Sequence, residues 1–229
     1  MKTKRVFWTE MAYVLGLVVL AIGTALMERA DFGMSMVVAP AYVLHLKVSQ
    51  FFAAYTFGMS EYVFQAVLLI VLSLVLRRFQ VSFLFSFVTA VLYGFVLDAV
   101  LALAAYLPCG SMVLRCVWYV LGMALCSVGV ALFFRTYIPP EAYELFVKEL
   151  AAKFGADIGK VKTLYDCCSC VLAIVLSFAF FGFGHFEGVK LGTVVCALVN
   201  GRLIAAVDKV LGSAFVFQDG LRLRRRFSA

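Results

Sequence analysis

The side chains that could do chemistry in this sequence are a few ionisable and amide groups set inside long apolar stretches. Asp98 lies four residues after Gly94 in one stretch, and Arg202 lies two residues after Asn200 in another. A charge inside a bilayer is costly, so such a residue marks a substrate, ion or proton site by default. An Asp98–Arg202 pair would offset the cost of burying either charge, as a structural ion pair or as a pair that faces substrate. We predict that Asp98, Arg202 and Asn200 line a substrate-binding site.

Two further polar positions belong to the predicted site. Gln65 and Asp166 each lie seven residues after a glycine, Gly58 and Gly159 respectively, at the start of an apolar stretch. Asp166 is suited to binding a cation or carrying a proton, or it is simply a solvated helix end. Glu61, one helical turn before Gln65, has the same two interpretations. We add Gln65 and Asp166 to the predicted substrate-binding set.

Enzyme and metal chemistry find no support in the residue pattern. The two histidines, His45 and His185, have no serine or cysteine partner at an informative spacing, and no phosphate-binding glycine loop is present. Cys167, Cys168 and Cys170 are close in sequence, but on a helix they point in different directions. We therefore predict no catalytic residues, no metal, no cofactor and no enzymatic activity. Transport, if present, is driven by a gradient or powered by another subunit.

The elements that must position these residues are membrane helices. The chain has 229 residues, of which 65% are hydrophobic and 14% charged, with a net charge of +7. A soluble domain of this size is about 45–50% apolar and about 25% charged, so the bilayer must be the solvent for most of the surface. The basic residues lie in short loops and tails rather than on an aromatic-rich face, which excludes nucleic acid as a partner. The composition predicts an all-α membrane protein.

Six stretches are long enough to cross the hydrocarbon core, which requires about 20 apolar residues. They cover residues 9–28, 60–77, 81–106, 113–135, 163–183 and 189–211. Basic residues gather on one side of such an arrangement, which predicts that the N- and C-termini are cytoplasmic. These residues are Lys2, Lys4, Arg5, Arg77, Arg78, Arg135, Lys148, Lys153, Lys160, Lys162, Arg222, Arg224, Arg225 and Arg226. Residues 212–229 are predicted to form a basic cytoplasmic tail.

Two segments between the spans are interrupted by glycine or proline. The segment 32–57 contains Gly33, Ser35 and Pro40, and the segment 138–159 begins with Pro139-Pro140 and continues as an amphipathic helix. Each segment is either an interfacial helix or a re-entrant element that lines a cavity. In the second case, these five residues belong to gating segments.

An internal repeat relates the two halves of the chain. Gly16, Gly23 and Arg29 recur at a constant offset of 106 as Gly122, Gly129 and Arg135, and Ala90-x-x-Tyr93-Gly94 matches Ala197-x-x-Asn200-Gly201. Each copy, 9–106 and 113–211, holds three spans and one interrupted segment. Because three is odd, the second copy must enter the membrane from the opposite side. The pattern predicts a single transmembrane domain built as an inverted repeat, which is typical of secondary transporters.

These residues resemble the YczE/YyaS/YitT group of bacterial membrane proteins. The resemblance rests on Gly23-x5-Arg29-Ala30-x-Phe32-Gly33-Met34-Ser35, on Gly58 and on the Gly94 turn followed by Asp98. Where many members have Trp-Asp shortly after the turn, this chain has Met36-Val37-Val38. The resemblance implies a multi-pass protein of the bacterial cytoplasmic membrane.

We therefore predict a gradient-driven transporter or permease of a small zwitterionic or ionic solute, with its site at the repeat interface. One alternative is the substrate-binding subunit of an energy-coupling-factor vitamin importer, because Ala21-x-x-x-Ala25 mimics the small-residue motif of such subunits. The duplication argues against it. A regulatory membrane protein is the other alternative. The expected partners are the lipid bilayer and the solute, and the Gly/Ala face of the first span would permit a homodimer.

Overall fold

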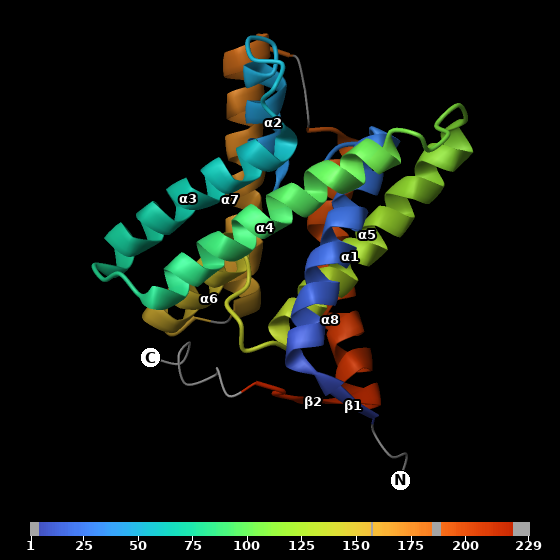
Figure 1. Cartoon of the computed structure of the whole chain (residues 1–229). Helices are drawn as coiled ribbons and strands as arrows, with labels where there is room; N and C mark the ends of the chain where they lie inside the picture. The colour runs from blue at the N-terminus through green and yellow to red at the C-terminus, as the bar shows by residue number, and fades with distance from the viewer. Residues whose placement is uncertain (1–4, 157, 185–188, 222–229) are drawn as a thin grey trace.

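The computed structural model describes residues 5–156, 158–184 and 189–221 (Figure 1). This part of the chain forms eight helices and a two-stranded parallel ribbon. The helices are α1 (Thr9–Ala30), α2 (Ala39–Val48), α3 (Phe57–Leu76), α4 (Val81–Ala104), α5 (Met112–Phe134), α6 (Ala142–Phe154), α7 (Ile158–Phe181) and α8 (Leu191–Ala214).

Five of these helices, α1, α3, α4, α5 and α7, are long and apolar enough to cross a membrane. They coincide with the first five predicted spans to within a few residues. The sixth predicted span corresponds to α8, which has 24 residues but carries Arg202, Asp208 and Lys209. The outer face of α3 is apolar, and Leu74 on it is 72% exposed. Such a surface is suited to lipid rather than water, so the chain is a multi-pass helical membrane protein.

The centre of the molecule is the crossing of α1 and α5. A Cβ atom added at Gly23 would lie 2.7 Å from the carbonyl oxygen of Gly122, and one added at Gly122 would lie 2.7 Å from the oxygen of Gly23. Gly16 and Gly129 meet in the same way, at 3.2 and 2.9 Å. Only glycine permits this close approach of two backbones. The packing that results holds the helices together in lipid, where no hydrophobic effect drives helix association.

The other helices pack around this pair in a regular order (Figure 1). α4 packs on α1 and α3, while α8 packs on α5 and α7. α2 contacts α3 and α7, and α6 contacts α7 and α3. The two short helices lie at opposite ends of the molecule, α2 at the top of the view and α6 at the bottom. Every one of these contacts is kept when α1–α4 are exchanged with α5–α8.

Local sequence explains where the helices begin and end. Thr56 caps α3, because its Oγ1 accepts a hydrogen bond from the Met59 N–H at 3.2 Å. Pro40 lies in the first turn of α2, where the missing N–H costs nothing. α6 ends at Gly155, whose φ of +60° is a left-handed conformation that glycine adopts without strain. The amphipathic helix predicted after Pro139-Pro140 is confirmed as α6.

The start of the predicted tail is structured rather than free. α8 continues to Ala214, and β2 (Phe215–Gln218) pairs in parallel with β1 (Arg5–Trp8). Phe7 packs edge-on against Phe215 and Phe217, with ring centroids 5.4 and 5.6 Å away. Residues 212–218 of the predicted tail therefore belong to the end of α8 and to β2. The topology signals at Lys2, Lys4, Arg222, Arg224, Arg225 and Arg226 lie outside the described residues.

Candidate functional site

Gln65, one of the predicted site residues, joins α3 to the beginning of α6. The side chain is fully buried. Its Nε2 donates hydrogen bonds to Glu61 Oε2 at 3.4 Å and to Glu141 Oε2 at 3.2 Å. Its Oε1 accepts from the Ala142 backbone N–H at 2.9 Å. Gln65 therefore holds two carboxyl groups from different elements next to one amide.

Glu61, Glu141 and Glu144 form a buried acidic cluster, and none of them is more than 6% exposed. Tyr143 OH donates to Glu61 Oε2 at 2.9 Å. Within the described residues, one carboxyl oxygen of each glutamate has no hydrogen-bond partner. Burial raises the pKa of Glu141 well above its usual range, and repulsion from Glu144 and Glu61 adds to this. Burial also raises the pKa of Glu144, against the attraction of Lys162. The cluster can hold a proton or receive a cation.

Only part of this cluster is predicted from the sequence. The spacing of Gln65 from Gly58 predicts it as a site residue, and Glu61 lies one turn before it. Glu141 and Glu144 were not predicted as site residues, because acidic residues are common in the first turn of a surface helix. The available signal was their place directly after Pro139-Pro140, in the segment already singled out as interrupted.

A large cavity reaches this acidic cluster. It has a volume of about 1020 Å³, lies between α5, α6, α7 and α8, and is lined by Glu144 and Asp166. Asp166 Oδ1 is 3.0 Å from Lys162 Nζ one turn earlier on α7. Small-molecule sites have volumes of about 300–1,000 Å³, so the cavity can accommodate a solute. The predicted site residue Asp166 therefore lines the cavity, and Lys162 partly neutralises its charge.

The structure does not bring Asp98 and Arg202 together, so the predicted ion pair is wrong. Asp98 Oδ2 accepts a hydrogen bond from Thr56 Oγ1 at 2.5 Å, and Oδ1 accepts from the Gly58 N–H at 2.8 Å. Asp98 thus fixes the N-terminus of α3 to α4. The error has a geometric cause. The helices that meet at the centre are α1 and α5, with α4 in front of them and α8 behind in the view of Figure 1.

The two predicted site residues of α8 have different surroundings. Arg202 is exposed and lines the cavity. Asn200 is buried, and its Oδ1 accepts a hydrogen bond from Ser127 Oγ at 2.9 Å. The Ser127 hydroxyl has a single hydrogen and can donate it either to Asn200 or to the Met123 carbonyl oxygen. Arg202 therefore belongs with the cavity, whereas Asn200 ties α8 to α5.

The first interrupted segment packs against the beginning of α8. Gly33 has a φ of +106°, and a Cβ there would lie 2.5 Å from Thr193 Oγ1. The carbonyl oxygen of the preceding residue, Phe32, accepts from the Gly192 N–H at 2.9 Å. Ser35 is half-buried, and its carbonyl oxygen accepts from Ala39 N–H at 2.9 Å as α2 begins. The turn is thus shaped to the end of α8.

The second interrupted segment packs against the beginning of α4 in a corresponding way. The Pro139 carbonyl oxygen accepts a hydrogen bond from Thr89 Oγ1 at 3.1 Å, and the Pro140 oxygen accepts from Ser86 Oγ at 2.7 Å. Proline cannot continue a hydrogen-bonded helix, which leaves these carbonyl groups free for α4. Each interrupted segment is therefore tied to the last long helix of the opposite half.

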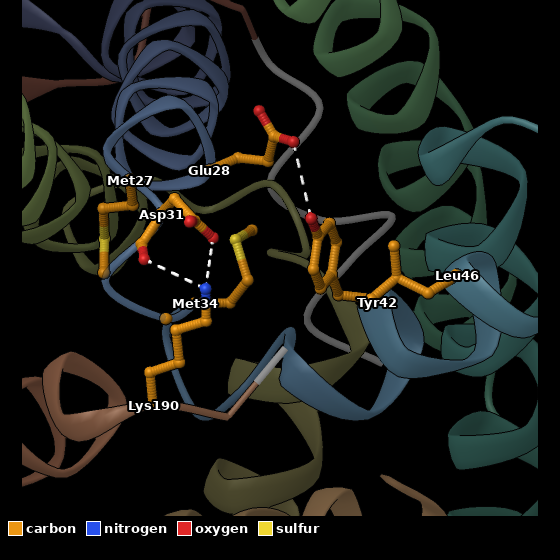
Figure 2. Close-up of a pocket in the computed structure, with 8 residues that line it drawn as sticks. Met27, Glu28, Asp31, Met34, Tyr42, Leu46 and Lys190 are labelled. Atoms are coloured by element: carbon orange, nitrogen blue, oxygen red, sulfur yellow. Dashed lines mark hydrogen bonds and ion pairs between the residues drawn. The ribbon is translucent and has the colours of Figure 1, made fainter. Parts of the chain in front are cut away.

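A second and much smaller pocket lies where α1 leads into α2. It has a volume of about 70 Å³ and lies between α1, α2 and the start of α8. Figure 2 shows Lys190 reaching Asp31 and Tyr42 pointing toward Glu28. Arg115 Nη2 also lies 2.7 Å from Asp31 Oδ2. Although burial acts to raise it, the pKa of Asp31 is lowered by Lys190 and Arg115. Two ion pairs of Asp31 thus join the residue after α1 to α5 and to the segment before α8.

The Gly/Ala face of α1 is used inside the chain. Ala21 and Ala25 are fully buried, and Gly16 and Gly23 meet α5. This face is not available for docking an ATPase module or a second copy. The feature that suggested the vitamin-importer subunit, and the face that would permit a homodimer, therefore have an intramolecular explanation.

A family model described as "Family of unknown function (DUF6198)" matches residues 7–209, and the chain belongs to this family. That description does not name the YczE/YyaS/YitT group, so the resemblance to the group stays a prediction. No curated protein and no solved structure matches the chain.

Proposed function

We propose that this member of the DUF6198 family is a gradient-driven transporter of a small zwitterionic or ionic solute. It lies in the bacterial cytoplasmic membrane with both termini on the cytoplasmic side and is not an enzyme. The observation that carries the proposal is the 1020 Å³ cavity, which is lined by the buried side chains of Glu144 and Asp166. An intramembrane carboxylate beside a cavity is typical of solute and proton pathways.

Two inverted copies, 9–106 and 113–211, form the proposed architecture. With the offset of 106, Gly16 corresponds to Gly122 and Gly23 corresponds to Gly129. The contact of Gly16 with Gly129 therefore becomes the contact of Gly122 with Gly23. Such reciprocity is what a two-fold axis between α1 and α5 requires.

The equivalent arginines support the same axis. Arg29 Nη2 donates to the Leu107 carbonyl oxygen at 2.7 Å, just after α4. Arg135 Nη2 donates to the Asp208 carbonyl oxygen at 2.9 Å, in the last turns of α8. Each arginine thus binds the end of the last helix of its own copy. A shared axis explains both contacts more simply than chance similarity between apolar helices.

One difference between the two copies supports alternating access. In the first copy, Gly58 and Gly94 are in backbone contact, and a Cβ at Gly58 would lie 2.3 Å from the Gly94 oxygen. In the second copy, a Cβ at Gly201, which corresponds to Gly94, would meet no atom within 4 Å. α3 and α4 are thus closed, whereas the cavity separates α7 from α8. We propose that the two pairs exchange these arrangements during transport, with the two interrupted segments as gates.

The test measures this exchange without knowing the solute. Tyr62 lies four residues after Gly58 in α3, and Ala90 lies four residues before Gly94 in α4. The corresponding second-copy positions, Thr163 and Ala197, line opposite walls of the cavity. Spin labels at these two positions, in a variant without native cysteines, report the width of the cavity by pulsed electron resonance in nanodiscs.

We expect a second, shorter distance for this pair when pH is varied or a solute panel is added. A control pair at Val14 and Val120, exposed positions on the α1–α5 pair, keeps one distance. A single unchanged distance for both pairs, together with no solute-dependent current in proteoliposomes on a solid-supported membrane, would refute transport. A regulatory role would then be favoured.

A further inference from the structure

The cavity between α5 and α8 has six charged side chains on otherwise largely apolar walls. The acidic ones are Glu144, Asp166 and Asp208, and the basic ones are Lys160, Lys162 and Arg202. Opposite charges within one cavity are normally paired with each other, because an unpaired charge away from water is costly. The side chains without such a partner therefore indicate what a ligand must supply.

Most of these charges already have partners. Lys162 Nζ lies 3.0 Å from Asp166 Oδ1, and Asp208 Oδ1 lies 2.5 Å from Arg135 Nε. Lys160 is also engaged in an interaction. These contacts account for four of the six charged side chains that line the cavity.

Glu144 and Arg202 remain. Glu144 is 6% exposed, lines the cavity from α6, and its Oε2 has no hydrogen-bond partner among the described residues. Arg202 lines the cavity from α8, and within the described part of the chain its guanidinium forms no ion pair. A carboxyl group with one unpartnered oxygen and a guanidinium without an ion pair among the described residues thus belong to different walls of the same cavity.

We propose that this cavity binds an apolar zwitterion, an α-amino acid with an aliphatic or aromatic side chain or a close analogue. The ligand's ammonium group would lie at Glu144, and its carboxylate would lie at Arg202, whose planar fork binds a carboxylate through two hydrogen bonds. The apolar body would pack against wall residues such as Val147, Leu198 and Ile204. The inference names the substrate class of the proposed transporter and rests on that function.

Charge balance favours a zwitterion over a simple ion. A monovalent cation would pair with Glu144 and leave Arg202 without a partner, and a monovalent anion would do the reverse. A zwitterion pairs with both groups and adds no net charge to a cavity that already holds three acidic and three basic side chains. Selectivity of this kind comes from the unpaired charge that the wrong ligand leaves behind.

The test compares three probes that differ by one charged group each. Binding of L-leucine, 3-methylbutylamine and 4-methylpentanoate to the purified full-length chain is measured by isothermal titration calorimetry, and L-phenylalanine serves as a second zwitterion. We expect at least one of the two amino acids to bind at least about tenfold more tightly than its single-charge analogues, the factor that 1.4 kcal/mol represents.

Two variants test which group of the ligand each side chain binds. E144Q should weaken L-leucine to the affinity of 4-methylpentanoate and leave 4-methylpentanoate unchanged. R202Q should weaken L-leucine to the affinity of 3-methylbutylamine. The matched controls are E149Q, on the same helix as Glu144, and K209Q, on the same helix as Arg202. Neither of these residues lines the cavity, so both variants should bind as the unmodified chain does.

The inference is overturned if neither amino acid binds, if the amine or the acid alone binds as tightly as the amino acid, or if R202Q leaves L-leucine affinity unchanged. Its failure is distinguishable from failure of transport. If other solutes change the distance between spin labels at Thr163 and Ala197 but no amino acid binds, only the proposal of a zwitterionic substrate is refuted. Amino-acid binding with an immobile cavity and no current would refute transport alone.

Discussion

The α1–α5 crossing predicts that one added methyl group at Gly23 is expensive. In the Gly23→Ala variant the new Cβ would lie 2.7 Å from the Gly122 oxygen and from the Cys126 nitrogen, both of them backbone atoms. Ordinary contacts begin near 3.4 Å, so the two helices must separate by about 0.7 Å. Overpacking of this kind costs about 1–3 kcal/mol. We expect a loss of about 2 kcal/mol in the free energy of unfolding.

The assay is thermal unfolding of the purified chain in detergent, where about 2 kcal/mol corresponds to a fall in Tm of about 4–8 °C for a chain of this size. The reciprocal variant Gly122→Ala should cost the same. The double variant should cost less than the sum, because the first substitution has already opened the gap that the second needs. Gly201→Ala is the control, since nothing lies within 4 Å of its Cβ. A Gly23→Ala variant as stable as Gly201→Ala would refute the reasoning.

Three further predictions concern polar contacts. Asp98→Ala removes the acceptor for Thr56 Oγ1 and for the first turn of α3, and should lower the free energy of unfolding by about 1–3 kcal/mol; a neutral result in detergent unfolding would contradict the anchoring role. Burial raises the pKa of Glu141. Above the usual pKa of a glutamate, the unfolded chain therefore loses a proton that the folded chain still holds. Stability should therefore fall as pH rises from 5 to 8, and Glu141→Gln should flatten that dependence; stability that rises with pH would contradict it. Arg135→Lys should lose the two-pronged contact with Asp208 at a cost of about 0.5–1 kcal/mol, because the pair is part-exposed, and equal Tm values for the two chains would argue against the contact.

Hydropathy predicted the long helices well because only the backbone pattern of a helix is satisfied within lipid. The boundaries of α1, α4 and α5 differ from the predicted spans by at most two residues. α7 begins five residues earlier than predicted, since Lys160 and Lys162 interrupt its apolar run without ending the helix.

Side-chain partners were harder to predict than helices. Asp98 and Arg202 were paired on their nearly equivalent places in the two copies, but equivalence does not say which helices meet on the axis. The glycines at positions 16, 23, 122 and 129 carried that information, because close approach needs them. Glu141 and Glu144 depend on the docking of α6 under α3 and α7, a contact that no local pattern specifies.

The ribbon of β1 and β2 also has a consequence for biosynthesis. Val6 pairs with Val216, and Thr9 Oγ1 donates to Asp219 Oδ1 at 3.1 Å, so neighbouring contacts bridge 210 positions of the chain. Residue 216 leaves the ribosome only after every helix has been translated, so the first strand waits through the whole of synthesis without its partner. The ribbon can therefore form only after α8 has been translated, and it joins the start of α1 to the segment that follows α8. A nascent chain halted before Phe215 would contain the eight described helices and still leave the edge of β1 without its partner strand.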